Sequence, residues 1–194
     1  MSVEQLYQDI IIDHYREKHH SGLRAPFGAE VHHVNPSCGD EVTLRVSMDG
    51  DTIGDVSYDA EGCSISQAST SVMCDLVIGR DVADSMALFD EFRDMMESQG
   101  RIEPDEDRLE DGIAFAGVAQ FPARVKCAML GWSALRDALI RAGVARVVAA
   151  MEDPNPLVAG QGLRKGKGVL VQRGFLVVVV VHVGADDDAN VFAP

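Results

Sequence analysis

Three cysteines and one aspartate are the residues of this chain best suited to chemistry, and they stand in three segments far apart in the sequence. A set of three thiols and one carboxylate offers four ligand atoms, which suits a tetrahedral Zn²⁺ ion. From spacing alone, three unrelated buried cysteines are an equally good interpretation. The candidate ligands are Cys38 and Asp40 in NPSCGDE (35–41), Cys63 in EGCSIS (61–66) and Cys127 in FPARVKCAML (121–130).

The three cysteines have similar predicted settings. Cys38 falls in a loop between two extended segments, Cys63 directly precedes a helix, and Cys127 falls in the opening turns of another. Helix N-termini carry partial positive charge and unpaired N–H groups, which stabilise thiolates. Asp40 can reach the same ion as Cys38 if the Gly39 backbone bends, but a carboxylate is a weaker ligand than a thiolate. The absence of a CxxC motif disfavours zinc ribbons and thioredoxin-type redox sites.

Other residues that could do chemistry have simpler interpretations. Cys74 is flanked by Met73 and Leu76 in a helical pattern, so we expect a buried small hydrophobe. The pairs His19-His20 and His32-His33 are interpreted as solvated or structural. The stretch GLRKGKGV lacks the spacing of a phosphate-binding loop.

The elements that position the cysteines follow from periodicity and turn signals. Ser2 and Gln5 form a capping-box pattern before a helix over about 3–18. Alternation and the Asp49-Gly50 turn predict three extended segments. We therefore expect an α+β fold, a small three-stranded antiparallel sheet packed by helices on one side, with the site at one end. The remaining predictions are strands at 29–34, 41–48 and 53–60, helices over 64–79, from 82 and over 123–142, and an acidic surface loop over 97–111.

Domain organisation and charge bound the possible functions. Residues 1–143 are predicted to form one domain, and 144–194, where periodicity is lost, an irregular C-terminal tail of unknown role. The net charge of −14 resides entirely in 1–143, which disfavours nucleic-acid binding. No secretory signal and no apolar run long enough for a membrane helix is recognisable. A cytoplasmic location is expected, where cysteines more often bind metal than form disulfides.

Four motifs resemble the U-type proteins of iron–sulfur cluster assembly, the IscU/SufU superfamily that includes the NifU N-terminal domain. They are LYQDIIIDHY, NPSCGDEVTL, EGCSISQAS and FPARVKCAMLGW, and the resemblance covers about residues 3–142. Two features resemble the SufU branch. Lys126 stands where the IscU pattern has a histidine, and the span from Cys63 to Cys127 is long.

The resemblance implies a zinc-dependent sulfurtransferase that accepts persulfide sulfur from a SufS-type, pyridoxal-phosphate cysteine desulfurase and serves downstream iron–sulfur assembly proteins. By position it implies Zn²⁺ on Cys38, Asp40, Cys63 and Cys127, with Cys38 as sulfur acceptor and Arg124 assisting. The alternative is a scaffold that assembles a [2Fe–2S] cluster on the same residues. A zinc hydrolase is disfavoured because four protein ligands leave no open position and H-E-x-x-H is absent. A purely structural zinc module remains a further alternative.

Overall fold

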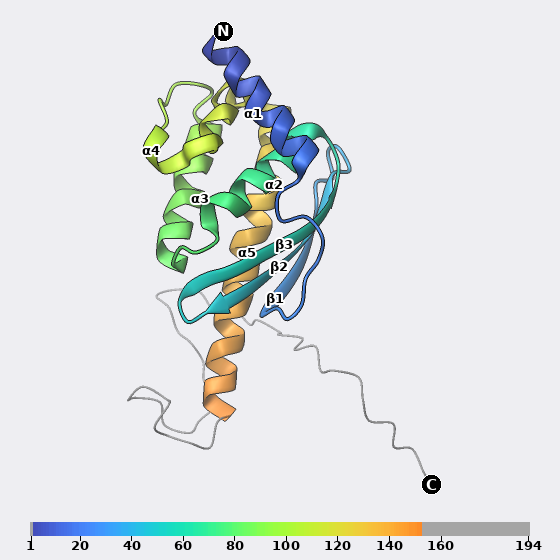
Figure 1. Cartoon of the computed structure of the whole chain (residues 1–194), viewed down its shortest axis with the longest axis vertical. Coiled ribbons are helices and arrows are strands. Elements are labelled where there is room, and N and C mark those ends of the chain that lie inside the picture. The colour runs from blue at the N-terminus through green and yellow to red at the C-terminus, as the bar shows by residue number, and fades with distance from the viewer. Residues whose placement is uncertain (1, 153–194) are drawn as a thin grey trace. The chain divides into compact units, whose positions relative to one another are not determined.

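The structure is a computed structural model that describes residues 2–152, with side chains described as far as Gly143. The chain divides into two units, Met1–Ala142 and Gly143–Pro194, and the account below concerns the first. Most of the expected C-terminal tail lies outside the described residues. The elements are α1 (Val3–Glu17), β1 (Ala29–Val34), β2 (Glu41–Asp49), β3 (Thr52–Glu61), α2 (Ser64–Val77), α3 (Val82–Glu97), α4 (Glu106–Leu109), the 3₁₀ helix η1 (Glu110–Gln120) and α5 (Pro122–Glu152) (Figure 1).

The sheet is antiparallel with strand order β1-β2-β3, which confirms the expected α+β fold class. Alternate residues of β2 face the core, because successive side chains of a strand point to opposite faces. Val42, Leu44 and Val46 are buried accordingly. Val34 pairs with Glu41, so the six residues between β1 and β2 form a loop at one end of the sheet. This loop carries Cys38 and Asp40.

The helices begin where the sequence provides capping side chains. The Ser2 hydroxyl accepts a hydrogen bond from the Gln5 N–H at 3.3 Å, and the Asp81 carboxylate accepts one from the Asp84 N–H at 2.8 Å. Such caps stabilise a helix by about 0.5–2 kcal/mol, because they satisfy N–H groups that have no partner within the helix. The predicted N-termini of α1 and α3 are therefore confirmed.

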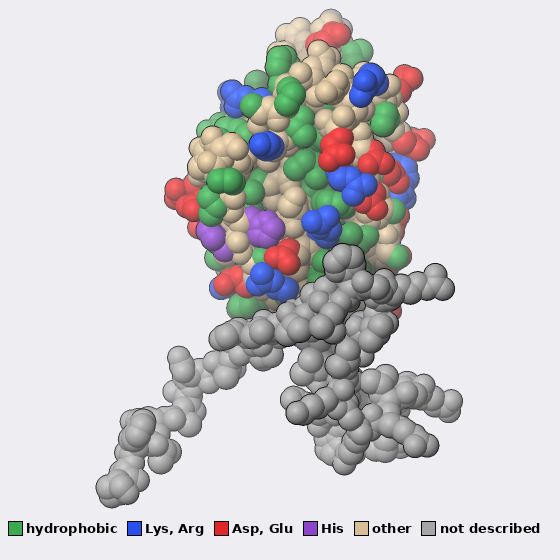
Figure 2. Space-filling view, turned by 180° about the vertical axis from the view of Figure 1, so that it is seen from behind, with side chains coloured by type: hydrophobic (Ala, Val, Ile, Leu, Met, Phe, Trp, Pro, Cys, Tyr) green, Lys and Arg blue, Asp and Glu red, His purple; other side chains and the backbone are tan. Residues whose placement is uncertain are grey.

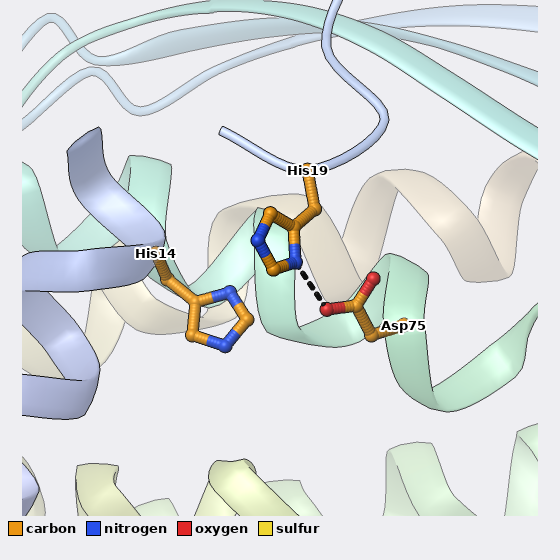
Figure 3. Close-up of side chains that lie close together, drawn as sticks. All are labelled: His14, His19 and Asp75. Atoms are coloured by element: carbon orange, nitrogen blue, oxygen red, sulfur yellow. Dashed lines mark hydrogen bonds and ion pairs between the residues drawn. The ribbon is translucent and has the colours of Figure 1, made fainter. Parts of the chain in front are cut away.

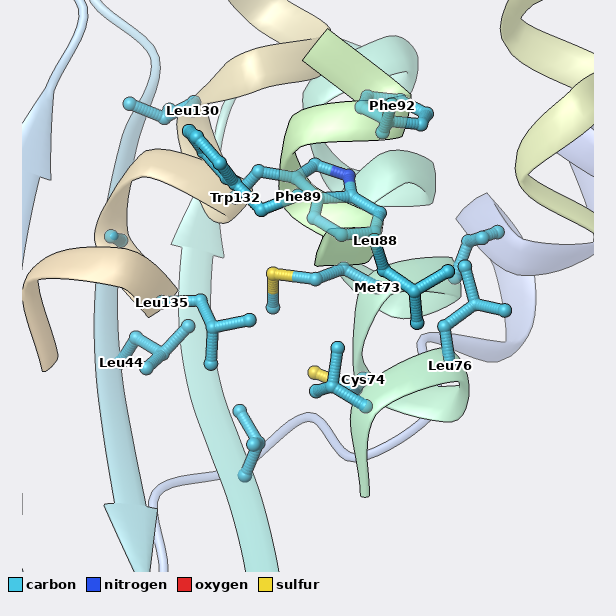
Figure 4. Packing of buried hydrophobic residues seen from close by; sticks show 14 of the residues in the cluster. Leu44, Met73, Cys74, Leu76, Leu88, Phe89, Phe92, Leu130, Trp132 and Leu135 are labelled. Carbon is cyan, nitrogen blue, oxygen red and sulfur yellow. The ribbon is translucent and has the colours of Figure 1, made fainter. Parts of the chain in front are cut away.

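One hydrophobic core joins the sheet to the helices. Leu44 of β2, Met73 and Cys74 of α2, and Leu135 of α5 converge in it (Figure 4). The rings of Phe92 in α3 and Trp132 in α5 stack with centroids 4.6 Å apart. Trp132, Leu135 and Leu139 of the helix expected over 123–142 are buried in this core, and the interpretation of Cys74 as a buried hydrophobe is confirmed by its complete burial.

The expected surface loop over 97–111 is wrong in part, because α4 and η1 begin within it. The Asp105 carboxylate caps α4 by accepting hydrogen bonds from the N–H groups of Asp107 and Arg108. Arg108 then binds carboxylates of α3, and η1 buries Phe115. Because the segment is highly charged, the sequence does not reveal these ion pairs or the burial of Phe115.

Oppositely charged side chains also lie next to one another elsewhere, as Figure 2 shows for one face of the molecule.

Candidate metal centre

The loop that carries Cys38 is closed by its own backbone. The Asn35 N–H donates to the Asp40 carbonyl at 2.7 Å, and the Gly39 N–H donates to the Asn35 carbonyl at 2.8 Å. Gly39 has φ +77°, a left-handed conformation that glycine adopts without strain. The backbone therefore bends between Cys38 and Asp40, which meets the condition for both side chains to reach one ion. Cys38 remains exposed at the loop, whereas Asp40 is buried.

Asp40 links this loop to the start of α2. Its Oδ1 accepts a hydrogen bond from the Cys63 N–H at 3.2 Å, while its Oδ2 is buried with no protein partner. Burial opposes ionisation, but the neighbouring thiols of Cys63 and Cys38 and the Ser66 hydroxyl lower the pKa of this carboxyl below its ordinary value. The side chain is thus held as a carboxylate with one oxygen available.

A glycine makes room for that carboxylate. A Cβ atom on Gly62 would lie 2.6 Å from the Asp40 Cγ, closer than non-bonded carbon atoms approach. Gly62 also has φ +154°. The residue before Cys63 must therefore be small for Asp40 to hold its position.

Cys127 reaches the same place from the first turns of α5. Its Sγ lies 3.6 Å from the Sγ of Cys38, and the ligand atoms of Cys38, Asp40 and Cys127 all lie within 4.8 Å of one another. Cys63, at the N-cap of α2, borders this triple through its N–H contact with Asp40. The structure therefore gathers the ligand atoms of three of the four residues that the sequence singled out, and places Cys63 beside them through its backbone.

The chemistry of these donors fits a thiophilic cation such as Zn²⁺. Burial, the hydrogen bond with Cys38 and the charge of Cys63 raise the pKa of the Cys127 thiol above its ordinary value. A bound cation relieves this opposition to ionisation, because metal binding exchanges thiol protons for metal–thiolate bonds. The buried, unpartnered Oδ2 of Asp40 is a donor of the kind that such a cation requires.

Arg124 lies one helical turn before Cys127 and is exposed. It lines a groove of about 610 Å³ rather than contacting the thiols. Sequence reasoning missed this groove, because its walls come from four separate segments that only the fold brings side by side. Its lining includes Tyr7 and Ile11 of α1, Ile65 of α2, Val118 of η1, Phe121 and Arg124.

Two further features bear on the site. Ser66, one turn after Cys63, was also missed; its hydroxyl lies 3.8 Å from the Cys63 Sγ. Burial raises the pKa of the Cys74 thiol well above its ordinary value, which suits an inert core residue. Among the described residues, no helix is both long and apolar enough to cross a bilayer.

Comparisons with known proteins agree with this architecture. Residues 6–140 match the family model described as the NifU-like N terminal domain. The chain is 40% identical over 144 residues to the iron–sulfur cluster assembly scaffold protein IscU of Streptococcus pyogenes, covering 74% of this chain and 89% of that protein. It is 38% identical over 140 residues to the zinc-dependent sulfurtransferase SufU of Bacillus subtilis, covering 72% and 93%.

A solved structure is also similar. It is described as a putative iron–sulfur cluster assembly scaffold protein for the SUF system from Fervidobacterium islandicum, with a TM-score of 0.64 and 37% identity over 71% of this chain and 99% of that one. A separate match of 43 residues, 58% identical, covers only 12% of the riboflavin biosynthesis protein RibD of Escherichia coli, too little to carry its activity over. With a fold, a clustered site and a family model that agree, the chain belongs to the NifU N-terminal family of IscU/SufU-type iron–sulfur cluster assembly proteins.

Proposed function

We propose that this protein is a zinc-dependent sulfur carrier that accepts persulfide sulfur from a cysteine desulfurase for iron–sulfur cluster assembly. The observation that carries the proposal is the unequal exposure of two thiols in contact. Cys38 is exposed on a loop, whereas Cys127 is buried in a helix. One thiol of the cluster can therefore meet a partner while its neighbour stays fixed. The Bacillus subtilis relative is named a zinc-dependent sulfurtransferase, which supports the same function.

In this proposal Cys38, Asp40, Cys63 and Cys127 hold the zinc, which supplies deprotonated thiols protected from oxidation. The Cys38 thiolate attacks the outer sulfur of the partner's cysteine persulfide. A new S–S bond forms on Cys38 as the partner's S–S bond breaks, and the partner cysteine leaves as a thiolate. No net oxidation occurs, because one persulfide replaces another.

The partner in this proposal is a pyridoxal-phosphate cysteine desulfurase of the SufS type. Phe121 and Arg124 lie within two turns before Cys127 in the chain, and they line the groove that continues from α5 onto α1. The Phe121 side chain is 60% exposed, so this surface offers an apolar contact beside a cation. We assign Arg124 to docking, where it pairs with a partner carboxylate or the incoming persulfide. A cytoplasmic location remains a prediction from the sequence.

A second candidate function is a scaffold on which a [2Fe–2S] cluster is assembled and transferred. The clustered Cys38, Asp40 and Cys127, with Cys63 beside them, offer four ligand atoms for two irons, and the Streptococcus pyogenes relative is named a scaffold. Against it, Lys126 stands where the IscU pattern has a histidine. In this candidate the cluster is cargo and not a resident group.

Metal content distinguishes the two candidates. The protein is purified without added metal, and zinc, iron and sulfide are quantified together with the visible absorbance. The sulfur-carrier proposal predicts one zinc per chain and a colourless protein. A brown protein with iron and acid-labile sulfide, and little zinc, would favour the scaffold.

A further inference from the structure

A second group of metal-ligating side chains lies away from the cysteines, where α1 meets α2. One ring nitrogen each of His14 and His19 and one carboxylate oxygen of Asp75 lie within 4.8 Å of one another. Figure 3 shows the two rings and the carboxylate facing a common space. The rings are close, with centroids 4.7 Å apart.

The backbone around His19 is fixed before any ligand arrives. Lys18 and His20 both have positive φ, 49° and 62°, so the chain turns sharply on either side of His19. The His19 N–H donates to the Oγ of Ser71, a fully buried residue of α2, at 3.0 Å. Asp75 follows Ser71 by one helical turn, so both residues lie on the face of α2 that meets this loop.

His14 is fixed from the other side. Its Nδ1 lies 2.9 Å from the Ser71 Oγ and its Nε2 lies 3.2 Å from the Asp111 Oδ2. The side chain is buried, with 6% of its surface exposed. Ser71 therefore holds the His14 ring and the His19 backbone at once, and the two imidazoles are placed by a shared hydroxyl.

Negative charge accumulates around these rings. The Asp75 carboxylate contacts His19 at 2.6 Å and His20 at 3.0 Å, and Glu17 contacts the other nitrogen of His19 at 2.9 Å. With Asp111, three carboxylates surround three imidazoles. When the imidazoles are neutral the group carries three negative charges, which a divalent cation offsets.

We propose that His14, His19 and Asp75 form a second divalent-cation site, selective for borderline metals such as Zn²⁺, separate from the cysteine centre. Two imidazoles and one carboxylate are a donor set that Zn²⁺ accepts, and they leave one position for water or a further ligand. Ligand atoms at about 2.0–2.1 Å from a tetrahedral ion lie roughly 3.3 Å apart. Binding therefore requires side-chain shifts on the order of 1 Å, in which the 2.6 Å contact between His19 Nδ1 and Asp75 Oδ2 widens and His19 exchanges a carboxylate hydrogen bond for the metal.

The test uses the full chain loaded with one equivalent of Zn²⁺, which the thiolates of the cysteine centre bind first, and then freed of unbound ion by gel filtration. Zn²⁺ is then titrated by calorimetry into the wild type, His19→Ala and Asp75→Asn. The His19 backbone contact with Ser71 does not need the imidazole, so His19→Ala keeps the loop anchored. The double variant His32→Asn/His33→Asn is the matched control, because these histidines lie on β1 outside the cluster.

We expect the wild type and the control to bind one additional Zn²⁺, and His19→Ala and Asp75→Asn to bind it at least about 100-fold more weakly, since even outer partners of a metal site contribute about 10–100-fold. Long-range ¹H–¹⁵N spectra of the wild type should show the His14 and His19 ring nitrogens shifting on addition of Zn²⁺ while His32 and His33 do not. No additional ion in the wild type, equal binding in His19→Ala, or unshifted His14 and His19 nitrogens would each overturn the proposal.

Discussion

The Sγ atoms of Cys38 and Cys127 lie 3.6 Å apart although 89 positions separate the two residues in the chain. One thiol is on an exposed loop at the end of the sheet and the other is buried in α5. A loop can change its backbone at little cost, whereas moving Cys127 would disturb a helix that packs into the core. In the sulfur-carrier proposal, this asymmetry is the reason to assign Cys38 as the thiol that is released from the metal.

Removing the Asp40 carboxylate should loosen the metal. Asp40→Ala deletes the buried Oδ2 that has no protein partner, and we expect zinc to pass to a competing chelator at least about tenfold more readily than from the wild type. Asp40→Cys should do the opposite and slow exchange, because a thiolate is the stronger ligand. Asp59→Ala, at an exposed position of β3, is the control. Equal zinc loss from Asp40→Ala and Asp59→Ala would contradict a ligand role for Asp40.

Gly62→Ala should displace the Asp40 carboxylate by steric contact. The added Cβ would meet the Asp40 Cγ at 2.6 Å, so the side chain or the backbone must move. We expect a loss of about 1–3 kcal/mol in the free energy of unfolding, together with weaker zinc retention. Gly117→Ala is the matched control, since an added Cβ there meets nothing within 4 Å. The comparison is made by urea unfolding and chelator competition, and indistinguishable variants would show that Asp40 is not held by this packing.

Replacing Arg124 should affect sulfur transfer more than stability. The side chain is exposed beside the groove, so Arg124→Ala should leave the melting temperature and zinc content unchanged. Loss of one docking charge is expected to slow transfer from the desulfurase by about tenfold at low salt, with a smaller effect at high salt. Arg16→Ala, an exposed arginine of α1, is the control. A wild-type rate of sulfur transfer in Arg124→Ala would contradict the docking role of this residue.

The pairing of Arg24 with Asp55 predicts a pH-dependent contribution to stability. Arg24 donates from Nε at 2.9 Å and from a terminal nitrogen at 2.8 Å, and these hydrogen bonds lower the pKa of the Asp55 carboxyl. The contribution is therefore full above the unfolded-state pKa of about 3.9 and is lost as pH falls through the lower folded-state value. Both side chains are about 40% exposed, so only about 0.2–1 kcal/mol is expected.

The measurement compares the wild type with Asp55→Asn by denaturant unfolding across the acid range. The penalty of the variant should be constant from neutral pH to about pH 4 and should shrink below it. Asp59→Asn serves as the control. A penalty that stays the same in acid would mean that Asp55 acts through something other than its charge.

The sequence predicted those parts of the fold whose signals are local. Strand alternation, the Asp49-Gly50 turn and the cap at Ser2 each act within a few residues, and the corresponding elements agree with the structure. The segment that contains α4 and η1 was misjudged because its stability comes from distant partners. Arg108 is held by α3, and Phe115 packs edge-on against Phe92.

In the candidate site too, the sequence predicts the residue types, whereas the features that depend on packing appear only in the structure. Residue types and motifs pointed to Cys38, Asp40, Cys63 and Cys127; the structure clusters the ligand atoms of Cys38, Asp40 and Cys127, and the Cys63 N–H contacts Asp40. The unpartnered Oδ2 of Asp40 and the close approach of Gly62 to that side chain depend on three-dimensional packing, which the spacing of residues in the sequence does not show. The same holds for the cluster of His14, His19 and Asp75. The sequence treated His19 as solvated or structural, because Asp75 and Ser71 approach it only through the packing of α1 on α2.

The most direct test of the central claim is to map the persulfide. Wild type, Cys38→Ala and Cys63→Ala are each incubated with a cysteine desulfurase and cysteine without reductant, and the added sulfur is located by mass spectrometry. The account predicts one extra sulfur on Cys38 in the wild type and none on Cys38→Ala. Sulfur accepted by Cys38→Ala at the wild-type rate, with the label on Cys63 or Cys127, would contradict the assigned acceptor. A protein that never carries extra sulfur, yet assembles a cluster from iron and sulfide, would contradict the sulfur-carrier function itself.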